Sequence, residues 1–435
     1  MVSVPVKEQQ AQEQGTGGLP TGARAALRRL PRTLWLVQAL FVALLILYST
    51  LAPTYQAPDE PHHVDMAMAA ARGQVFPWPE PTGRENSLQV QRSLRPYEAG
   101  TQWDQWWSTR WVEAPPRAQR PAFAEIAPDI PSGEPNQMAQ HPPLYYYLAG
   151  AWLNAGVFET QPFDLVAGWQ RLLSVVLVAP LPLFAYLTAR RLCRDERVAL
   201  AAAMLPLAVP QLLHIGSVAS NDSLLIALFG LLTVPVALAS TGDLRWRTAV
   251  VAGLAAGLAL LTKGFALAAY AWLPAAYVLG VARTRRYRQG MAAGVIALAV
   301  ATAVGGWWWI RNQIVYGTPQ PAGRPRDPAP PDFSPQPFAE YLDFFARHFT
   351  HRFWGSFGWL EVSLPWAVVV AAAAVVLVGL LAALLFRRRS DPSWRVDILL
   401  LVLPTVAILG IVLAGGWESY QATGFHNGVQ GRYVL

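Results

Sequence analysis

The chain has 435 residues, of which 53% are hydrophobic and only 14% are charged, and its formal net charge is +7. A soluble domain usually carries about 25% charged residues, so this composition excludes a soluble enzyme or a disordered protein for most of the chain. The single cysteine, Cys193, excludes an intramolecular disulfide and a zinc ribbon.

Apolar runs dominate the chain after a basic amino terminus. Residues 1–33 are predicted to be disordered and cytoplasmic. A helix needs roughly 17–25 apolar residues to cross a bilayer. Runs near that length predict an all-α polytopic membrane protein with about nine transmembrane helices, in a domain over residues 34–414. The runs are 34–52, 165–189, 198–217, 224–240, 249–262, 265–282, 291–310, 362–386 and 398–414.

Arginine clusters between these runs predict the orientation in the membrane, because cytoplasmic loops carry an excess of Lys and Arg. With nine spans all the clusters fall on the cytoplasmic side, provided that the segment 141–153 (HPPLYYYLAGAWL) does not cross. We interpret that segment as an interfacial helix, because Tyr and Trp prefer the headgroup layer. The clusters are Arg24, Arg28, Arg29, Arg32; Arg190, Arg191, Arg194, Arg197; Arg245, Arg247; Arg283, Arg285, Arg286, Arg288; and Arg387, Arg388, Arg389.

Two large loops, 53–164 and 311–361, and a carboxyl-terminal segment, 415–435, then lie outside the cytoplasm. The expected location is the plasma (inner) membrane, with multiple crossings. Whether further helices follow residue 435 is left open by the sequence.

The first outer loop begins with an unusual group of polar side chains. The sequence PTYQAPDEPHHVD carries Asp59, Glu60, His62 and His63 directly after the first span. Asp59 could simply cap a helix that begins at Glu60. Two acids and two histidines within one or two helical turns are more than a cap requires, so we expect them to line a cavity at the membrane surface.

Further polar residues are predicted on the same side, and each has a structural alternative. Asn221 and Asp222 precede a span, where Asp222 could be a helix cap. Lys263 lies between two spans and could extend to lipid headgroups. Arg311 follows GGWWWI and could anchor a Trp belt, and Arg432 is a third outer cation. Ionisable groups at a membrane indicate a functional site by default.

Carboxylates and cations at a lipid surface favour one kind of chemistry. Lys and Arg suit a phosphate whose tail stays in the bilayer. A carboxylate facing it can accept a proton from an attacking hydroxyl, while the cations stabilise the departing phosphate. This pattern predicts sugar transfer from a lipid phosphate, with inversion.

From about residue 34 to 435 the chain resembles the GT-C superfamily of polytopic membrane glycosyltransferases, which includes protein O-mannosyltransferases and the aminoarabinose transferases acting on lipid A. The resemblance rests on APDEPHH, HPPLYYYLAG, SNDSLL, LTKGFAL and WWWIRNQIVYG in that order. RFWGSFGWLEVSLP and QGRYVL are more similar to bacterial members whose substrate is not assigned.

The resemblance implies a glycosyltransferase that uses a polyprenyl-phosphate-sugar donor on the extracytoplasmic face. It implies Asp59 as the base and Glu60 as its partner in acceptor or metal binding. It implies donor-phosphate ligands at Lys263, Arg311, His141 and Arg432, where His141 replaces the basic residue of some relatives, and a cavity lined by Asp222, Asn221, His62 and His63. A divalent ion, Mg²⁺ or Mn²⁺, held by Asp59, Glu60 and His63 stays open, because members differ in metal dependence.

Two other functions remain open from the sequence. One is a non-catalytic lipid- or glycan-binding assembly protein, and the other is a transporter or flippase of lipid-linked sugar. A transporter is expected to carry ionisable groups near the middle of its spans, whereas here they lie at one edge. Nucleic-acid binding is not expected, since the arginine clusters are short and juxtamembrane. The sugar, the acceptor (protein, glycan or lipid) and the oligomeric state are not indicated.

Overall fold

The structure is a computed structural model that describes residues 30–94, 116, 119–156, 158–324, 328–385, 394–426 and 428–435. The expectations for the amino-terminal tail up to residue 29 and for the arginines at 387–389 lie outside the described residues. All long elements are helices, so the all-α class is confirmed. The described strands form two short antiparallel pairs, β1 (Glu85–Ser87) with β2 (Pro131–Pro135) and β3 (Ser356–Phe357) with β4 (Val362–Ser363).

Seven helical segments in the described part of the chain are long and apolar enough to cross a bilayer. They are α2 (Arg32–Leu51), α7–α8 (Phe163–Cys193), α11 (Asn221–Ser240), η8–α13 (Gly264–Thr284), α14–η9–α15 (Tyr287–Tyr316), α17 (Trp366–Leu385) and α18 (Trp394–Thr423). The composite segments divide into α7 (Phe163–Val178) and α8 (Leu181–Cys193), η8 (Gly264–Ala268) and α13 (Ala269–Thr284), and α14 (Tyr287–Ala301), the π-helical η9 (Thr302–Gly306) and α15 (Trp307–Tyr316). Nine runs were predicted, and the other two form shorter helices.

Prolines divide the run predicted at 198–217. Here α9 (Glu196–Met204) gives way to η7 (Leu205–Ala208), which contains Pro206, and α10 (Pro210–Ile215) begins at the next proline. Each proline removes a backbone donor and restricts the residue before it, so two of them four positions apart prevent one continuous helix. The run at 249–262 forms α12 (Trp246–Leu260), whose 15 residues span about 22 Å.

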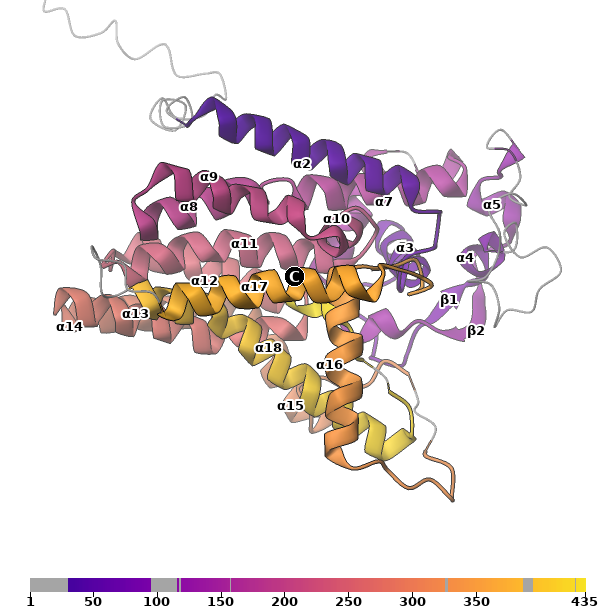
Figure 1. Cartoon of the computed structure of the whole chain (residues 1–435). Helices are drawn as coiled ribbons and strands as arrows, with labels where there is room; N and C mark the ends of the chain where they lie inside the picture. The colour runs from indigo at the N-terminus through magenta and orange to yellow at the C-terminus, as the bar shows by residue number, and fades with distance from the viewer. Residues whose placement is uncertain are drawn as a thin grey trace, which may run out of the picture.

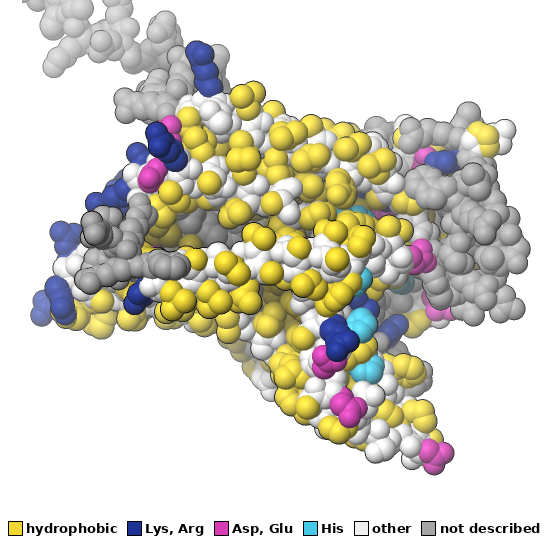
Figure 2. Space-filling model, in the orientation of Figure 1, with side chains coloured by type: hydrophobic (Ala, Val, Ile, Leu, Met, Phe, Trp, Pro, Cys, Tyr) yellow, Lys and Arg dark blue, Asp and Glu magenta, His cyan; other side chains and the backbone are white. Residues whose placement is uncertain are grey.

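The central helices pack side by side as a bundle around α11 (Figure 1). α11 contacts α7, α8, α12 and α13, while α2 lies along one side against α7 and α8. α17 lies on the outside of the bundle, where Val369 alone of its residues is buried. Hydrophobic side chains cover most of the face that includes α17 (Figure 2), as expected of a surface in contact with lipid.

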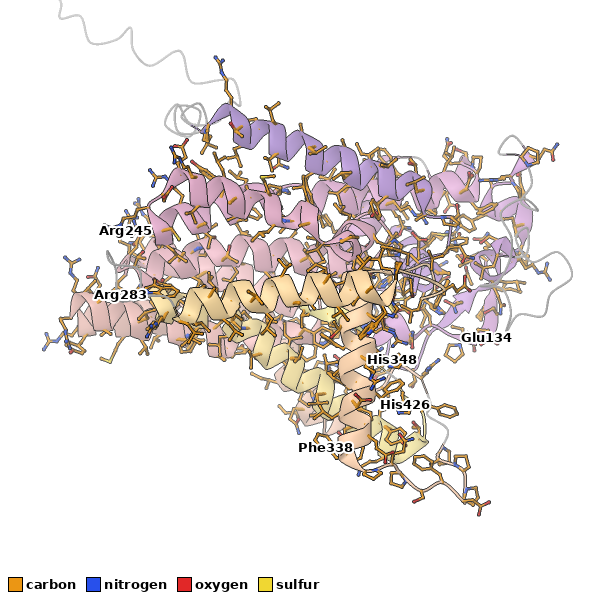
Figure 3. All side chains as sticks on the ribbon, viewed as in Figure 1. Glu134, Arg245, Arg283, Phe338, His348 and His426 are labelled. Atoms are coloured by element: carbon orange, nitrogen blue, oxygen red, sulfur yellow. The ribbon has the colours of Figure 1, made fainter. Side chains whose placement is uncertain are left out.

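Arginines gather at one end of the bundle. Arg283 donates to the Ser240 carbonyl at 3.0 Å, and Arg191 donates to Thr241 at 2.7 Å, so the loops after α8, α11 and α13 meet. Arg245 and Arg283 lie at this end, far from Glu134 in the first loop (Figure 3). The orientation of this end toward the cytoplasm stays a prediction.

The first loop folds at the opposite end, as α3 (Glu60–Ala71), α4 (Leu88–Ser93), α5 (Phe123–Ile126), η5 (Gln137–Gln140), α6 (Leu144–Ala155) and η6 (Phe158–Thr160). The segment interpreted as an interfacial helix forms α6, whose 12 residues span about 18 Å, too short to cross. Its Tyr145 and Tyr146 are fully buried and pack against the His63 ring of α3, instead of facing the headgroup layer.

The second loop returns the end of the chain to the bundle. α16 (Phe338–Trp354) runs steeply to α17 and extends past the edge of the central helices (Figure 1), and the short helix η10 (Gly431–Val434) packs against α16 and α18. The carboxyl terminus therefore lies at the middle of the molecule (Figure 1).

Close packing of α12 against η9 predicts a cost for added volume at Gly305. A Cβ at this residue would stand 2.0 Å from the Gly257 carbonyl oxygen. We expect Gly305→Ala to cost about 1–3 kcal/mol and to lower the thermal midpoint of the purified protein in detergent. Gly379→Ala on α17 is the control, because a Cβ there meets nothing within 4 Å; equal midpoints for the two variants would contradict this packing.

Candidate functional site

Four charged side chains from distant parts of the sequence meet at the end of the bundle opposite the arginine loops. Arg432 of η10 donates to Asp59 at 2.8 Å, and its Nε lies 3.7 Å from an Asp222 oxygen. Lys263 donates to the other Asp222 oxygen at 2.5 Å. We call Asp59, Asp222, Lys263 and Arg432 the charge cluster.

Asp59 has a strained backbone and does not cap a helix. Its φ of 63° and ψ of 5° are left-handed, and in the described structure its side chain makes no capping bond to α3. Instead its carboxylate accepts from Arg432 and, at 3.1 Å, from Gln137. The capping interpretation is therefore wrong for Asp59. A non-glycine residue held in this conformation is often found at functional sites.

Ionic contacts also hold Asp59 in its charged form. Burial alone would raise its pKa, but the charge and hydrogen bond of Arg432, together with the nearby His62 and His63, hold the pKa of Asp59 below its usual range. Asp59 in turn raises the pKa of Arg432, against the opposing effect of burial. Asp59 and Arg432 are thus an ionised pair.

Asp222 lies in the first turn of α11, but Ser220 supplies the cap by accepting from the Asp222 amide at 3.1 Å. The capping interpretation is wrong here too. Lys263 has extended backbone between α12 and η8, and it is 7% exposed. It therefore does not extend to headgroups. Its ammonium lies 5.1 Å from the Tyr433 ring centre and 3.4 Å from the Asn221 side-chain oxygen.

The three predicted histidines lie around the charge cluster. His62 pairs with Asn86, and His63 pairs with the Tyr146 hydroxyl, each at 3.0 Å. Burial, together with the charge of Lys263, lowers the pKa of His141 to about 3. His141 is neutral at pH 7 and provides no cation for a phosphate.

Glu60, although it follows Asp59 directly, belongs to a different contact. It is fully buried, and both of its oxygens accept from Arg171 at 2.7 Å. Of the two acids expected to act together, Asp59 alone joins the charge cluster.

Arg311 lies apart from the charge cluster. It is exposed on α15, where its guanidinium packs over the rings of Trp308 and Tyr316 and bonds the neighbouring Asn312. These contacts match the alternative of a cation within a Trp belt.

The expected metal ligands do not converge. Glu60 is bound to Arg171 and His63 to Tyr146, whereas Asp59 binds Arg432. Among the described residues, no three His, Cys, Asp or Glu side chains are grouped so that they could hold a metal ion. The residues present do not fit the divalent ion that the resemblance left open.

An apolar cavity of about 370 Å³ adjoins the charge cluster. It follows α11 from Asp222 to Thr233, a rise of roughly 16 Å, and includes residues of α8, α18 and η10. Asp222 and Arg432 are the charged residues among the described residues that line it. The cavity thus combines a long apolar wall with two charges at one end.

Several buried polar atoms in this region have no hydrogen-bond partner among the described residues. They are the side-chain nitrogen of Asn221, Oδ2 of Asp222, Nδ1 of His141 and Nε of Arg432. An unsatisfied buried polar group costs about 1–3 kcal/mol, so these atoms favour a polar ligand or water at this position.

Three residues that make contacts in this region were not predicted from the sequence. Arg171 lies inside a predicted span, where a charge is itself a sign of function. Gln137 and Tyr433 contact Asp59 and Lys263 respectively, and nothing in their sequence context distinguishes them.

Comparison with known proteins gives a family for the chain. Residues 40–435 match a family described as "Predicted membrane protein (DUF2142)". The chain belongs to this family. It is a multi-pass membrane protein, as its composition predicts, and the family description states no reaction. No protein of curated function matches the chain.

The lowered pKa of His141 predicts how stability in this DUF2142 protein changes with pH. Between its ordinary pKa of 6.5 and about 3, the unfolded chain binds the imidazole proton more readily than the folded chain does. His141 therefore contributes stability above pH 6.5 that is lost as the pH falls. We expect the thermal midpoint of His141→Gln to decline less than that of wild type from pH 7.5 to pH 5; parallel declines would contradict a neutral imidazole at pH 7.

Proposed function

We propose that this protein is a membrane glycosyltransferase that moves a sugar from a polyprenyl-phosphate-sugar donor to an acceptor on the extracytoplasmic face. One observation carries the proposal: the charge cluster lies at the end of an apolar cavity that shares Asp222 and Arg432 with it. In this proposal the polyprenyl chain enters the cavity and its phosphate meets Arg432 and Lys263. The shorter helices α9–α10 and α12 then also lie in the bilayer, which gives nine crossings of a GT-C-like domain.

The proposed reaction is a single inverting displacement. An acceptor hydroxyl attacks the anomeric carbon of the sugar, and the bond from that carbon to the phosphate oxygen breaks. The electron pair of this bond stays on the phosphate, where Lys263 and Arg432 stabilise the added charge. The proton of the hydroxyl passes to Asp59.

A carboxylate paired with arginine is a weak base. Binding of the donor is proposed to make Asp59 a stronger base. A phosphate that binds Arg432 competes with Asp59 for the same guanidinium. When that pairing weakens, the pKa of Asp59 rises toward its usual range, because Arg432 is the largest influence that lowers it. Donor binding thus prepares the base.

Two other functions fit less of the geometry. Asp222 and Lys263 lie at the ends of candidate spans, whereas a transporter is expected to carry such groups near mid-membrane. One observation favours a non-catalytic protein that binds lipid phosphates or glycans. Asp59 is already paired with Arg432, and a carboxylate in such a pair is a weak base. Activity measurements on Asp59 separate this second candidate from the transferase.

Asp59→Asn is expected to reduce sugar transfer by about 10²–10⁴-fold, the usual contribution of a general base. Asparagine tolerates left-handed backbone, so the loop keeps its shape. The measurement is transfer of labelled sugar from defined polyprenyl-phosphate donors, with purified protein in liposomes supplied with membrane acceptors. Asp343→Asn is the control, because that acid is exposed on α16 and pairs with Arg347. Wild-type rates in Asp59→Asn would remove the base assignment.

Arg432→Gln and Lys263→Met are expected to weaken binding of a polyprenyl phosphate at least tenfold, because Arg432 lines the end of the cavity and Lys263 is the cation bonded to Asp222 there. Binding to the purified variants is measured by the shift of the thermal midpoint with increasing lipid phosphate, and the matching uncharged polyprenol is the ligand control. Arg347→Gln, on the exposed surface of α16, is the control variant. Unchanged affinity in both cluster variants would exclude their role as phosphate ligands.

A further inference from the structure

A second buried ion pair lies beside the charge cluster. Glu60 and Arg171 are 0% and 4% exposed, and their two parallel bonds are each 2.7 Å long. The Glu60 oxygens also accept from the Tyr55 amide at 2.9 Å and from the Ala219 amide at 3.1 Å. Each oxygen therefore accepts two hydrogen bonds, which is the full capacity of a carboxylate.

Arg171 uses its other donors on the end of the first span. It donates to the carbonyl of Ser49 at 2.9 Å and to those of Ala52 and Pro53 at 2.6 Å. Carbonyls at the end of a helix lack partners within the helix, so the guanidinium satisfies them. The pair joins α7 to the end of α2, to the start of α3 and to the segment before α11.

These connections reach both acids of the charge cluster through the backbone. Glu60 is the residue after Asp59, and Ala219 lies three residues before Asp222. The Glu60 bonds to the Tyr55 and Ala219 amides hold the turn before Asp59 beside the segment before Asp222. The described contacts of the pair do not include the side chains of Lys263 or Arg432.

We propose that Glu60 and Arg171 are positioning residues, which fix Asp59 and Asp222 relative to each other and take no part in the reaction. This inference rests on the proposed function, and it replaces the role for Glu60 in acceptor or metal binding that the resemblance implies. If Glu60 turned to a ligand, a buried arginine would lose its counter-ion, which is strongly unfavourable.

The test compares Glu60→Gln with Asp59→Asn and with a matched control on α7, the helix that carries Arg171. Asp164→Asn disrupts another ion pair of α7, with Arg120 at 2.7 Å, and Asp164 is 5% exposed. The measurements are kcat per folded molecule, KM for the donor, and hydrogen exchange of residues 53–59 and 217–222. Arg171→Lys is a second variant, because lysine cannot reproduce the planar set of donors.

We expect Glu60→Gln and Arg171→Lys to lower kcat by about 10–100-fold, to change KM for the donor less than threefold, and to increase exchange in both segments. The general-base loss in Asp59→Asn is larger, about 10²–10⁴-fold, and comes without that increase. Asp164→Asn is expected to lower the thermal midpoint but to keep kcat per folded molecule and the exchange of both segments.

Three outcomes overturn the positioning role, two of them when the wild type transfers sugar. Glu60→Gln with unchanged exchange and a loss equal to that of Asp59→Asn would make Glu60 a direct participant, and an unchanged kcat would make the pair merely structural. If wild type transfers no sugar from any donor tested, the proposed function fails. In that case hydrogen exchange of the two segments is the remaining test of the positioning role. The same protection in Glu60→Gln as in wild type overturns that role.

Discussion

Pairing of buried charges is the constraint on which this structure depends. A charge removed from water is tolerated only when an opposite charge and hydrogen bonds replace its hydration. The buried Asp222 and the partly buried Asp59, whose side chain is 22% exposed, are matched by the buried Lys263 and Arg432. These four residues come from the first loop, the start of α11, the turn after α12 and the end of the chain. Their mutual attraction therefore connects segments that apolar packing alone leaves unspecified.

Hydropathy predicts where helices occur but not where they are interrupted. Each of the nine predicted runs contains at least one helix in its described part, because apolar runs in a membrane protein must satisfy their backbone bonds internally. The run at 198–217 is broken by Pro206 and Pro210, whereas α11 and α13 each contain one internal proline, Pro235 and Pro274, and continue. Two closely spaced prolines break a helix where a single proline does not. Hydropathy summed over a window does not detect this difference.

The position of charges at the edge of apolar runs predicted most of the charge cluster. The contacts between these side chains and the directions in which they face could not be predicted from the sequence. Arg311 was expected among the phosphate ligands, and it follows η9, a π-helical turn that changes the rotational phase of the helix after it. In α15 the neighbouring Trp309 and Asn312 are buried while Arg311 faces outward. Likewise, the adjacency of Asp59 and Glu60 in sequence suggested a shared role, yet a left-handed residue at 59 sends the two side chains to different partners.

The apolar cavity and the charge cluster are physically coupled, because Asp222 and Arg432 belong to both. Arg432 is carried by η10, so any group that binds this guanidinium also contacts the element that holds the chain end against α16. Among the described residues, the side-chain nitrogen of Asn221, Oδ2 of Asp222 and Nε of Arg432 have no hydrogen-bond partner. The charges are thus paired while the hydrogen bonds remain incomplete. An anionic headgroup with additional hydroxyl groups satisfies both requirements, since the phosphate competes for the cations and the hydroxyls complete the bonds. A simple anion satisfies the first alone, and a neutral lipid satisfies neither.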